Sequence, residues 1–496
     1  MSALDANGVL PPPAQLEAAR KALIHKLPKE GAGLDWVKKH LQSDIVPGLN
    51  QNGGQNYYGF VTGGATEAAR YADNVVTAYD QNVQVHLPKE TVATDVEAAA
   101  LEMVCEILAP DPQGSSAPPR DAEVWLHRTF TTGATASNVL GLACGREYVV
   151  QAAARRLGRS ISTGDLGISS AMRVAELDTV QVLTTVAHSS LRKAASIVGL
   201  GRSNVHDVGR DDAPHVIDID KLVSSMRQPK TASIVAVSCA EVNTGLFATN
   251  GDLIRQIRSA CDEYGGWLHI DAAFGLLATV LPSGAGYDTI KAGVEELHLA
   301  DSVAGDAHKL LNVPYDCGIF LSRYLEIATE VFQNSNAAYL NSAAQGSSGT
   351  SNITIPSPLN IGIENSRRFR ALPVYATLIA YGRQWYSDML ERQIQLSRSI
   401  ARFIAETPGL ELLPASQGLS LEKRLESVYM IVMFRADQEE LNANLAQRIN
   451  ATRRIYVSGT QWEGRPATRF AIANWKVDVS RDFELVRQIL LDVVNS

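Results

Sequence analysis

The middle of this sequence alternates short apolar runs with longer stretches of helical periodicity, and this alternation limits the possible folds more than any other feature. The apolar runs expected to form strands are Glu123–Leu126, Thr179–Thr184, Ile234–Cys239, Trp267–Ile270, Ser302–Ala304 and Cys317–Leu321. Strands that are separated by helices form mainly parallel sheets covered on both faces. The sequence therefore predicts a large α/β domain with its ligand site at the carboxyl ends of the strands.

Two segments with other patterns flank this region. Between residues 15 and 46, apolar side chains recur at helical spacing with a break around Pro28, which predicts an arm of short helices. From about Pro373, a long helical pattern and then strand-like runs predict a smaller α+β domain. These last runs are Ser427–Met433, Arg454–Val457 and Thr468–Asn474. The expected organisation is an N-terminal arm (1–64), a large domain (65–372) and a small C-terminal domain (373–496).

Composition disfavours several kinds of partner and location. The formal net charge is -8 and the chain has no dense run of Lys and Arg, so nucleic acid is not expected as a partner. The N-terminal residues lack the charged and apolar regions of a signal peptide, and no stretch of about 18 consecutive residues is apolar. Five scattered cysteines without the spacing of a zinc or redox motif indicate reduced thiols. We therefore expect a cytoplasmic protein with no membrane contact and no metal site.

The first candidate for chemistry is Lys309, which lies between His308 and two leucines just after an expected strand. An ammonium group in such an apolar region is costly to bury unless it is neutral, paired or used covalently. A lysine that forms a Schiff base meets this condition because its imine is part of a ligand. The alternative is a buried lysine that is paired for structural reasons.

The second candidate is Asp271, which ends the apolar strand that begins at Trp267. An acid at this position can cap the following helix. It can also face the nitrogen of a pyridine ring and keep that nitrogen protonated, which makes the ring a stronger acceptor of electrons. The spacing between Asp271 and Lys309 allows one crossover and a second parallel strand, which would bring both residues to the same edge of the sheet.

Two further motifs follow expected strands. Small and hydroxyl-bearing residues between Thr131 and Asn138 precede a helical pattern, and such a helix start either is an ordinary cap or presents N–H groups to a phosphate. His188 follows the strand that ends at Thr184. A histidine there is either structural or able to stack on a pyridine ring.

Taken together and in this order, these motifs resemble the group II pyridoxal 5'-phosphate (PLP)-dependent decarboxylases of fold type I. This family includes the aromatic-amino-acid, tyrosine, histidine and glutamate decarboxylases. The similarity runs from about Tyr57 to the C-terminus. It includes the four motifs above and the segments Tyr58–Gly64, Ser366–Leu372 and Arg469–Trp475. The resemblance implies a PLP-dependent transferase fold of type I and the removal of the α-carboxylate of an amino acid.

The resemblance also implies roles for individual residues. Lys309 would carry the cofactor as a Schiff base, Asp271 would bind the pyridine nitrogen, and His188 would stack on the ring and contact the substrate carboxylate. Further cofactor contacts are expected from Ala134, Thr135 and His308 at the phosphate, and from Asn243 and Ala273. Two positions depart from the family pattern, because Glu241 stands where relatives commonly have Thr and Asp306 where some have Asn.

A third departure concerns the product. In the family, a mobile loop often from the neighbouring subunit supplies a tyrosine that protonates the α-carbon, but the matching segment Asn341–Asn352 has no tyrosine. Its small polar composition predicts a mobile lid, and the nearest tyrosine is Tyr339. Three hypotheses stay open: an amine-forming decarboxylase, an aldehyde synthase, carbon–carbon lyase or transaminase that uses the same site, and a non-catalytic binding protein. The presence of Lys309, Asp271 and His188 disfavours the last.

The substrate is expected to be an amino acid, with an aromatic or apolar side chain favoured. The candidate pocket residues are Tyr57, Tyr58, Phe60 and Tyr339, although the first three can equally be aromatics that pack an ordered arm. Arg367 and Arg368 are either a clamp for an anionic substrate or ion-pair partners of Glu364. The short apolar arm and the family's shared active site predict a homodimer.

Overall fold

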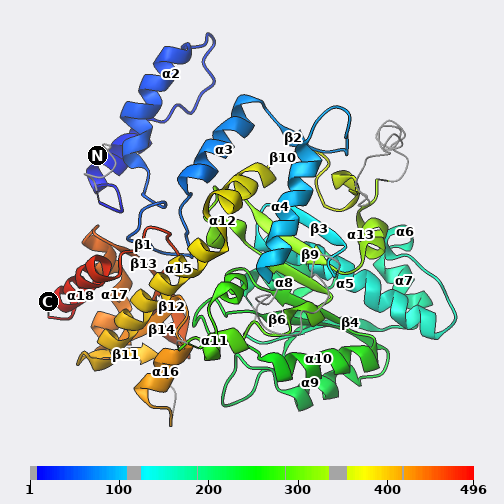
Figure 1. Cartoon of the computed structure of the whole chain (residues 1–496). Helices are drawn as coiled ribbons and strands as arrows, with labels where there is room; N and C mark the ends of the chain where they lie inside the picture. Colours follow the sequence, from blue (N-terminus) through cyan, green and yellow to red (C-terminus); the bar gives the residue numbers. More distant parts are fainter. Residues whose placement is uncertain are drawn as a thin grey trace. The chain divides into compact units, whose positions relative to one another are not determined.

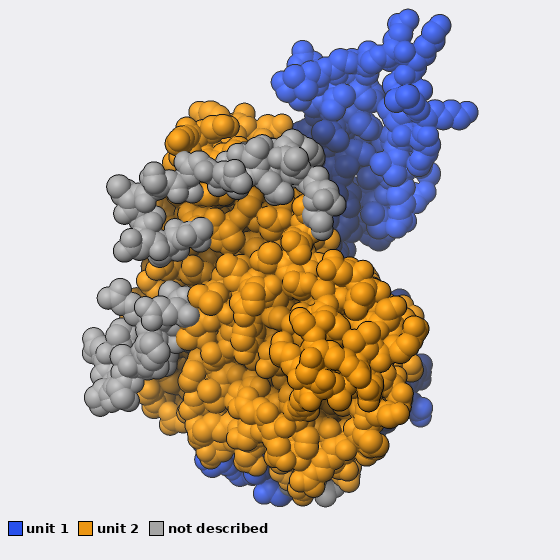
Figure 2. All heavy atoms as spheres, turned by 90° about the vertical axis from the view of Figure 1, so that its right-hand side faces the viewer, with its two compact units in different colours: residues 1–64, 392–496 blue, residues 65–391 orange. Residues whose placement is uncertain are grey.

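The structure is a computed structural model that describes residues 8–108, 124–186, 188–284, 286–334, 355–415 and 418–495. The chain forms two compact units: residues 1–64 together with 392–496 make unit 1, and residues 65–391 make unit 2 (Figure 2). Tyr339 and the segment Asn341–Asn352, for which a lid is predicted, lie outside the described residues. None of the helices in the described ranges is long and apolar enough to cross a membrane.

Unit 2 is built on a seven-stranded sheet within the described residues, in the order β3-β9-β8-β7-β6-β4-β5 (Figure 1). Its strands are β3 (His127–Thr131), β4 (Thr179–Thr184), β5 (Val205–Asp207), β6 (Thr231–Ser238), β7 (Trp267–Asp271), β8 (Ser302–Gly305) and β9 (Gly318–Ser322). The strands β5, β4, β6, β7 and β8 run parallel to one another, whereas β9 lies between β8 and β3 and is antiparallel to both. The predicted α/β fold with a mainly parallel sheet is confirmed.

The first predicted strand is wrong in position. Strand β3 begins at His127 and not at residue 123, and the exposed fraction of Leu126 is 54%. The apolar residues before β3 drew the prediction, but the hydrogen bonds to β9 are made by the following residues, where polar and apolar side chains are both buried. The sequence analysis also missed β5, because three residues are too few to give a periodic signal.

Helices follow these strands along the chain. The helices of unit 2 are α3 (Glu67–Ala78), α4 (Ala93–Leu108), α5 (Ala134–Arg156), α6 (Thr163–Leu166), α7 (Ile168–Val174), α8 (Ser189–Ile197), α9 (Ile219–Met226), α10 (Gly251–Tyr264), α11 (Asp288–Ala292), α12 (Ala307–Leu310) and α13 (Leu325–Phe332). Helix α5 packs on β6, β7, β8 and β9, and it is buried along most of its length. Its apolar side chains join those of β4, β6 and β7 in the core, so α5 is fixed against the centre of the sheet.

Unit 1 holds a second sheet in the order β1-β13-β14-β12-β11. Its strands are β1 (Tyr57–Tyr58), β11 (Leu410–Leu413), β12 (Ile431–Ala436), β13 (Tyr456–Trp462) and β14 (Arg465–Ala471). Its helices include α1 (Pro13–Ala22), α2 (Leu34–His40), α16 (Leu421–Ser427), α17 (Glu439–Ala451) and α18 (Val479–Val494). The long helix α15 (Ala371–Glu406) belongs to unit 2 as far as Glu391 and to unit 1 from Arg392, and it has a kink at Gly382, where φ is 69°. The predicted short helices of the arm, with a break between them, are confirmed.

The C-terminal strands are shifted from their predicted positions. The predicted run from Ser427 begins where α16 ends, and β12 follows it. Strands β13 and β14 form a hairpin whose turn contains Glu463 and Gly464, and several of the side chains beside that turn are exposed. Apolar runs end before such polar residues, so the sequence predicts β13 too early and β14 too late.

Candidate active site

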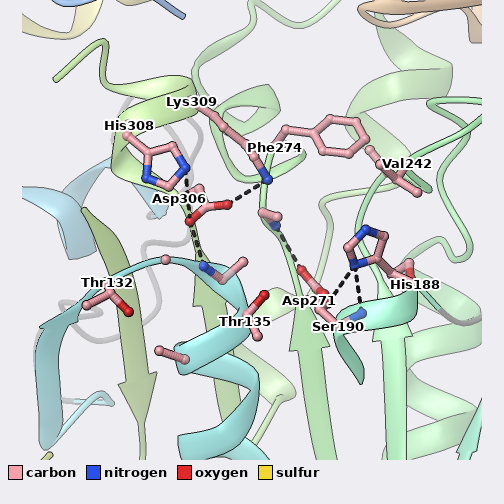
Figure 3. A pocket seen from close by; sticks show the side chains of 16 residues that line it. Thr132, Thr135, His188, Ser190, Val242, Asp271, Phe274, Asp306, His308 and Lys309 are labelled. Atoms are coloured by element: carbon pink, nitrogen blue, oxygen red, sulfur yellow. Dashed lines mark hydrogen bonds and ion pairs between the residues drawn. The ribbon is translucent and has the colours of Figure 1, made fainter. Parts of the chain in front are cut away.

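The carboxyl ends of the parallel strands in unit 2 surround a pocket of about 280 Å³. This volume lies near the lower end of the range for ligand pockets, about 300 to 1,000 Å³. The sequence-predicted site residues that line it are Ala134, Thr135, His188, Asp271, Ala273, His308 and Lys309. In Figure 3, Asp306 and His308 lie on one side of the pocket, Val242 and His188 on the other, and Lys309 between them. The fold therefore brings four separate motifs of the sequence to one place.

Lys309 follows β8 by way of Asp306 and lies on the short helix α12. Its Nζ is 2.6 Å from Oδ2 of Asp306, and the other oxygen of the same carboxylate accepts the N–H of Ala134 at 2.6 Å. The side chain of Asp306 is almost fully buried, whereas one fifth of the Lys309 side chain is exposed. The amine is therefore paired, yet it reaches the pocket.

The N-terminus of α5 forms one end of the pocket. Gly133 precedes the helix with φ of 153°, which L side chains rarely adopt, and a Cβ there would lie 3.4 Å from both Asp306 Oδ1 and His308 Cε1. Glycine therefore keeps this end open. Thr135 lies in the first helical turn, where backbone N–H groups have no partner within the helix and the helix dipole favours an anion. Such a helix start is able to bind a phosphate group.

His308 contributes a second donor at this end. The backbone N–H of Cys317 donates to its Nδ1 at 3.3 Å, so the ring proton is on Nε2, which lies 3.7 Å from Asp306 Oδ1. Burial lowers the pKa of His308 below its ordinary value. The ring is therefore neutral at physiological pH, with its N–H group on the side of Asp306.

Asp271 ends β7 at the floor of the pocket. Its Oδ1 accepts the N–H of Ala273 at 3.2 Å, and its Oδ2 accepts a hydrogen bond from Nδ2 of Asn138 at 2.8 Å. These donors hold the carboxylate in one orientation without a cation beside it. It can therefore still receive a hydrogen bond from a protonated ring nitrogen.

His188 is the residue that caps the N-terminus of α8. Its Nδ1 accepts the backbone N–H of Ser190 at 3.2 Å and lies 2.6 Å from the hydroxyl of the same serine. Because Nδ1 accepts, the proton of the neutral ring is on Nε2. The exposed ring can cover a planar ligand above Asp271.

The loop after β6 differs from the prediction in detail. Glu241 is buried and its two carboxylate oxygens accept hydrogen bonds from the backbone N–H groups of Asn243 and Thr244, both at 2.9 Å. They also accept from the side chains of the same two residues, at 3.2 and 3.0 Å. The acid therefore closes the loop on itself. Asn243 is not among the lining residues, and Val242 beside it is.

The predicted substrate-pocket residues lie in unit 1 or outside the described ranges. The ring of Tyr57 stacks on Tyr456 with 4.6 Å between centroids, and Tyr58 is 1% exposed in the hydrophobic core of unit 1. Phe60 is 62% exposed. Tyr57 and Tyr58 therefore fit the alternative in which these aromatic residues pack an ordered arm. That Tyr57, Tyr58, Phe60 and Tyr339 contact the substrate stays a prediction.

The two arginines are engaged in ion pairs. Arg367 is buried and donates to both carboxylate oxygens of Glu97, at 2.8 Å for the longer bond, on strand β10 (Arg367–Arg368), which pairs with β2 (Asn82–Val83). Arg368 lies 2.6 Å from Asp73. The structural alternative therefore describes them, although neither pairs with Glu364.

Sequence reasoning missed two residues that shape the site. Asp306 is named above only as a departure from the family pattern, yet it joins Lys309 to the N-terminus of α5. Asn138 was named in its motif without a role. Its position four residues after Ala134 on one helix would have placed both on the same face.

The residues present fit a ligand with three separate features. The N-terminus of α5 and His308 can bind a phosphate, and Asp271 can accept a hydrogen bond from a protonated ring nitrogen. The amine of Lys309 can form a Schiff base with an aldehyde. PLP has these three groups. The fold and the pocket therefore define a PLP-dependent enzyme of fold type I.

Comparison with known proteins agrees with this class. A model of the pyridoxal-dependent decarboxylase conserved domain matches residues 19–421. The chain is 28% identical over 366 residues to an L-2,4-diaminobutyrate decarboxylase of Acinetobacter baumannii, which covers 73% of this chain and 68% of that protein. The chain belongs to the pyridoxal-dependent decarboxylase family and is a lyase that uses PLP.

Solved structures share its fold. The crystal structure of Oryza sativa TDC with PLP and tryptamine matches with a TM-score of 0.76 at 18% identity, over 99% of this chain and 94% of that one. The crystal structure of Rhodiola rosea 4-hydroxyphenylacetaldehyde synthase also matches with a TM-score of 0.76, at 16% identity and over 99% and 94% of the two chains. At these identities the likeness concerns the fold alone.

Proposed function

We propose that this enzyme decarboxylates an L-amino acid with an aromatic or apolar side chain to the corresponding amine. The observation that carries the proposal is the meeting of Lys309, Asp271 and His188 in one pocket that has a helix N-terminus at one end. A binding protein without catalysis would need none of these three side chains in this arrangement.

Each residue has a proposed role. Lys309 would hold the aldehyde group of PLP through its Nζ. The N-terminus of α5, with Thr135, and the Nε2–H of His308 bind the phosphate. Asp271 holds the proton on the ring nitrogen. PLP, when bound, supplies the conjugated system that accepts the electrons left on the α-carbon when CO2 departs.

His188 has two proposed tasks. Its ring covers the face of the cofactor and limits the access of water to the α-carbon. Its Nε2–H, which the acceptor role of Nδ1 fixes, would donate to the substrate carboxylate and orient the bond that breaks. This orientation aligns the departing electron pair with the conjugated system.

The preference for an aromatic or apolar side chain has support from two lining residues. Phe274 and Val242 line the pocket on the side of His188 (Figure 3). A polar or charged substrate side chain placed against these two would lose hydration without a partner. The decarboxylase of A. baumannii acts, by its name, on diaminobutyrate, so this amino acid belongs in the test as a competing substrate.

A second candidate function is an oxygen-dependent aldehyde synthase. It is favoured by the absence of tyrosine from residues 341–352, because the family's protonating residue is a tyrosine in the matching loop. An enzyme of the same fold that is named for an aldehyde product, from Rhodiola rosea, is known. In the amine-forming reaction, the proton would come from His188, Tyr339 or a bound water.

One experiment separates these outcomes. The purified enzyme is incubated with PLP and single amino acids, including tryptophan, tyrosine, phenylalanine, leucine, glutamate and 2,4-diaminobutyrate, and the products are identified by mass spectrometry with CO2 and O2 uptake measured in parallel. The proposal predicts amine and CO2 in equal amounts from an aromatic or apolar substrate, and nothing from Lys309→Ala. Aldehyde with peroxide and O2 uptake would favour the second candidate, and turnover of diaminobutyrate alone would overturn the substrate class.

We also propose a homodimer in the cytoplasm. Several apolar side chains of the arm are largely exposed, among them Leu27 at 97%, Leu34 at 68% and Ile24 at 58%. The arm is too short to cover them with a core of its own, and the surface of a second copy would cover them. The five cysteines are free and buried, in keeping with a reducing compartment.

A further inference from the structure

Behind the pocket, a chain of buried polar side chains runs from the core of the sheet to Asp271. Nε1 of Trp267 donates to Ser302 Oγ at 3.0 Å, and the same oxygen lies 2.8 Å from Nδ1 of His269. Nε2 of His269 lies 2.9 Å from Oδ1 of Asn138, whose Nδ2 reaches Asp271 Oδ2 at 2.8 Å. His269, Asn138, Ser302 and Trp267 have no exposed surface.

The chemistry of the groups fixes the direction of every bond. The Asp271 carboxylate accepts only, so Asn138 must turn its amide NH2 toward it and its carbonyl oxygen toward His269. Burial lowers the pKa of His269 far below its ordinary value, so the ring is neutral. Its Nε2 therefore carries the proton, and its Nδ1 must accept the hydroxyl proton of Ser302. All donors then point toward Asp271.

The packing of α5 maintains this arrangement. Gly141 lies three residues after Asn138 on the helix, and a Cβ at this position would lie 2.4 Å from Cε1 of His269. Only a residue without a side chain lets the imidazole approach α5 closely enough to meet the Asn138 carbonyl. Asn138 and Gly141 thus share one face of the helix. Asn138 accepts a hydrogen bond from the imidazole of His269, and Gly141 leaves the space that the imidazole occupies.

The same amide reaches the second functional side chain. Nδ2 of Asn138 also donates to Ser190 Oγ at 3.3 Å. That hydroxyl lies 2.6 Å from Nδ1 of His188, which already accepts the backbone N–H of Ser190. Nδ1 must therefore accept the hydroxyl proton as well. One NH2 group is thus shared between the carboxylate of Asp271 and the serine that holds His188.

We infer that Asn138 is a positioning residue that fixes Asp271 and His188 together, with His269 and Ser302 fixing Asn138 in turn. This inference rests on the proposed function, in which Asp271 would bind the ring nitrogen of PLP and His188 would cover the ring. Asn138 orients the carboxylate of Asp271 by a hydrogen bond and, through Ser190, holds His188 in the tautomer that carries its proton on Nε2. It touches neither cofactor nor substrate.

The test is a double-mutant cycle with two readouts. Asn138→Leu, Asp271→Asn and the double variant are compared with wild type for the dissociation constant of PLP, from absorbance titration of the apoprotein, and for kcat and KM. Asn138→Leu alone should weaken PLP binding about tenfold and lower kcat more than it raises KM, because a hydrogen bond to a charged group is lost. In the double variant the loss should stay within about threefold of Asp271→Asn alone.

A matched control separates positioning from simple damage to the fold. Asn442 in unit 1 is also a buried amide, which accepts the N–H of Ala436 and donates to the carbonyl of Pro466. Asn442→Leu should lower thermal stability without changing the dissociation constant of PLP. Multiplied losses in the double variant, or unchanged PLP binding in Asn138→Leu, would overturn the inference. Wild type that binds no PLP on Lys309 would instead overturn the proposed function.

Discussion

Nζ of Lys309 lies 2.6 Å from Oδ2 of Asp306, and both belong to the segment that follows β8. The same carboxylate accepts the N–H of Ala134 at the start of α5. The lysine is therefore tied to the phosphate end of the pocket through one acid. An amine attacks an aldehyde through its lone pair, so the contact with Asp306 must open before Lys309 binds one.

Asp306→Asn should therefore bind PLP faster than wild type. The amide can still accept the N–H of Ala134 through its oxygen but no longer pairs with an ammonium, and it repels a phosphate less. Loss of about 1.4 kcal/mol of charge pairing corresponds to an association rate about tenfold higher. Stopped-flow absorbance of apoprotein mixed with PLP measures it. Asp306→Ala is the control, because it loses both the contact with Lys309 and the contact with Ala134. An unchanged association rate of PLP in Asp306→Asn would show that Asp306 does not slow the binding of PLP.

Asp271→Asn should keep part of its PLP but lose most of its activity. The amide cannot hold the proton on the ring nitrogen, so the ring accepts electrons less well. The expected cost in the activation barrier is about 2–4 kcal/mol, as for loss of a charge-assisted hydrogen bond. Steady-state kinetics with saturating PLP gives the value, and near wild-type kcat would exclude Asp271 from the mechanism.

Charged substitutions on the arm should dissociate the dimer. Ile24→Glu combined with Leu27→Glu places two carboxylates where the proposed interface buries apolar side chains. With about 1.5–3 kcal/mol for each buried side chain, dimer affinity should fall roughly 100-fold or more. Sedimentation velocity measures it, with the exposed neighbour Lys26→Glu as control. A wild-type monomer with full activity would contradict the proposal.

A buried histidine should make unit 2 sensitive to acid. His127 donates from Nε2 to the carbonyl of Ile361 at 2.7 Å, and burial lowers its pKa from 6.5 to about 4. As pH falls below 6.5, the unfolded chain takes up this proton and the folded chain does not. The contribution of His127 to the free energy of unfolding is therefore present above pH 6.5 and is lost by about 1.4 kcal/mol per unit as pH falls toward 4.

Urea unfolding of wild type and His127→Gln at pH 7, 6, 5 and 4.5 checks this. Stability of the wild type should fall more steeply with acid than that of the variant, and the difference between them should change by roughly 2–3 kcal/mol across the range. A difference that is constant with pH would mean that His127 is protonated in the folded state.

The sequence predicted the sheet of unit 2 well because its central strands are apolar on both faces, and it predicted the pocket because motifs at the ends of parallel strands meet at one edge. Strand limits at β3, β12 and β13 failed, since backbone pairing and not hydropathy decides where a strand begins. The role of Glu241 was also hidden, because its carboxylate serves the loop that follows it.

Residues of the supporting network could not be predicted in the same way. Asn138, His269 and Ser302 lie on three different elements, and each alone is an ordinary buried polar residue. Only their distances in the fold reveal that they end at Asp271. The role of Gly141 could not be predicted from the sequence, because this residue acts only through the space that it leaves for the side chain of His269.

The most direct test of the account is to locate the cofactor on the chain. The purified enzyme with PLP is reduced with borohydride, digested and analysed by peptide mass spectrometry, with Lys309→Ala treated in parallel. The account predicts loss of the visible absorption band and a pyridoxyl group on Lys309 alone, with none in the variant. A pyridoxyl group on another lysine of the wild type, at comparable yield, would contradict it.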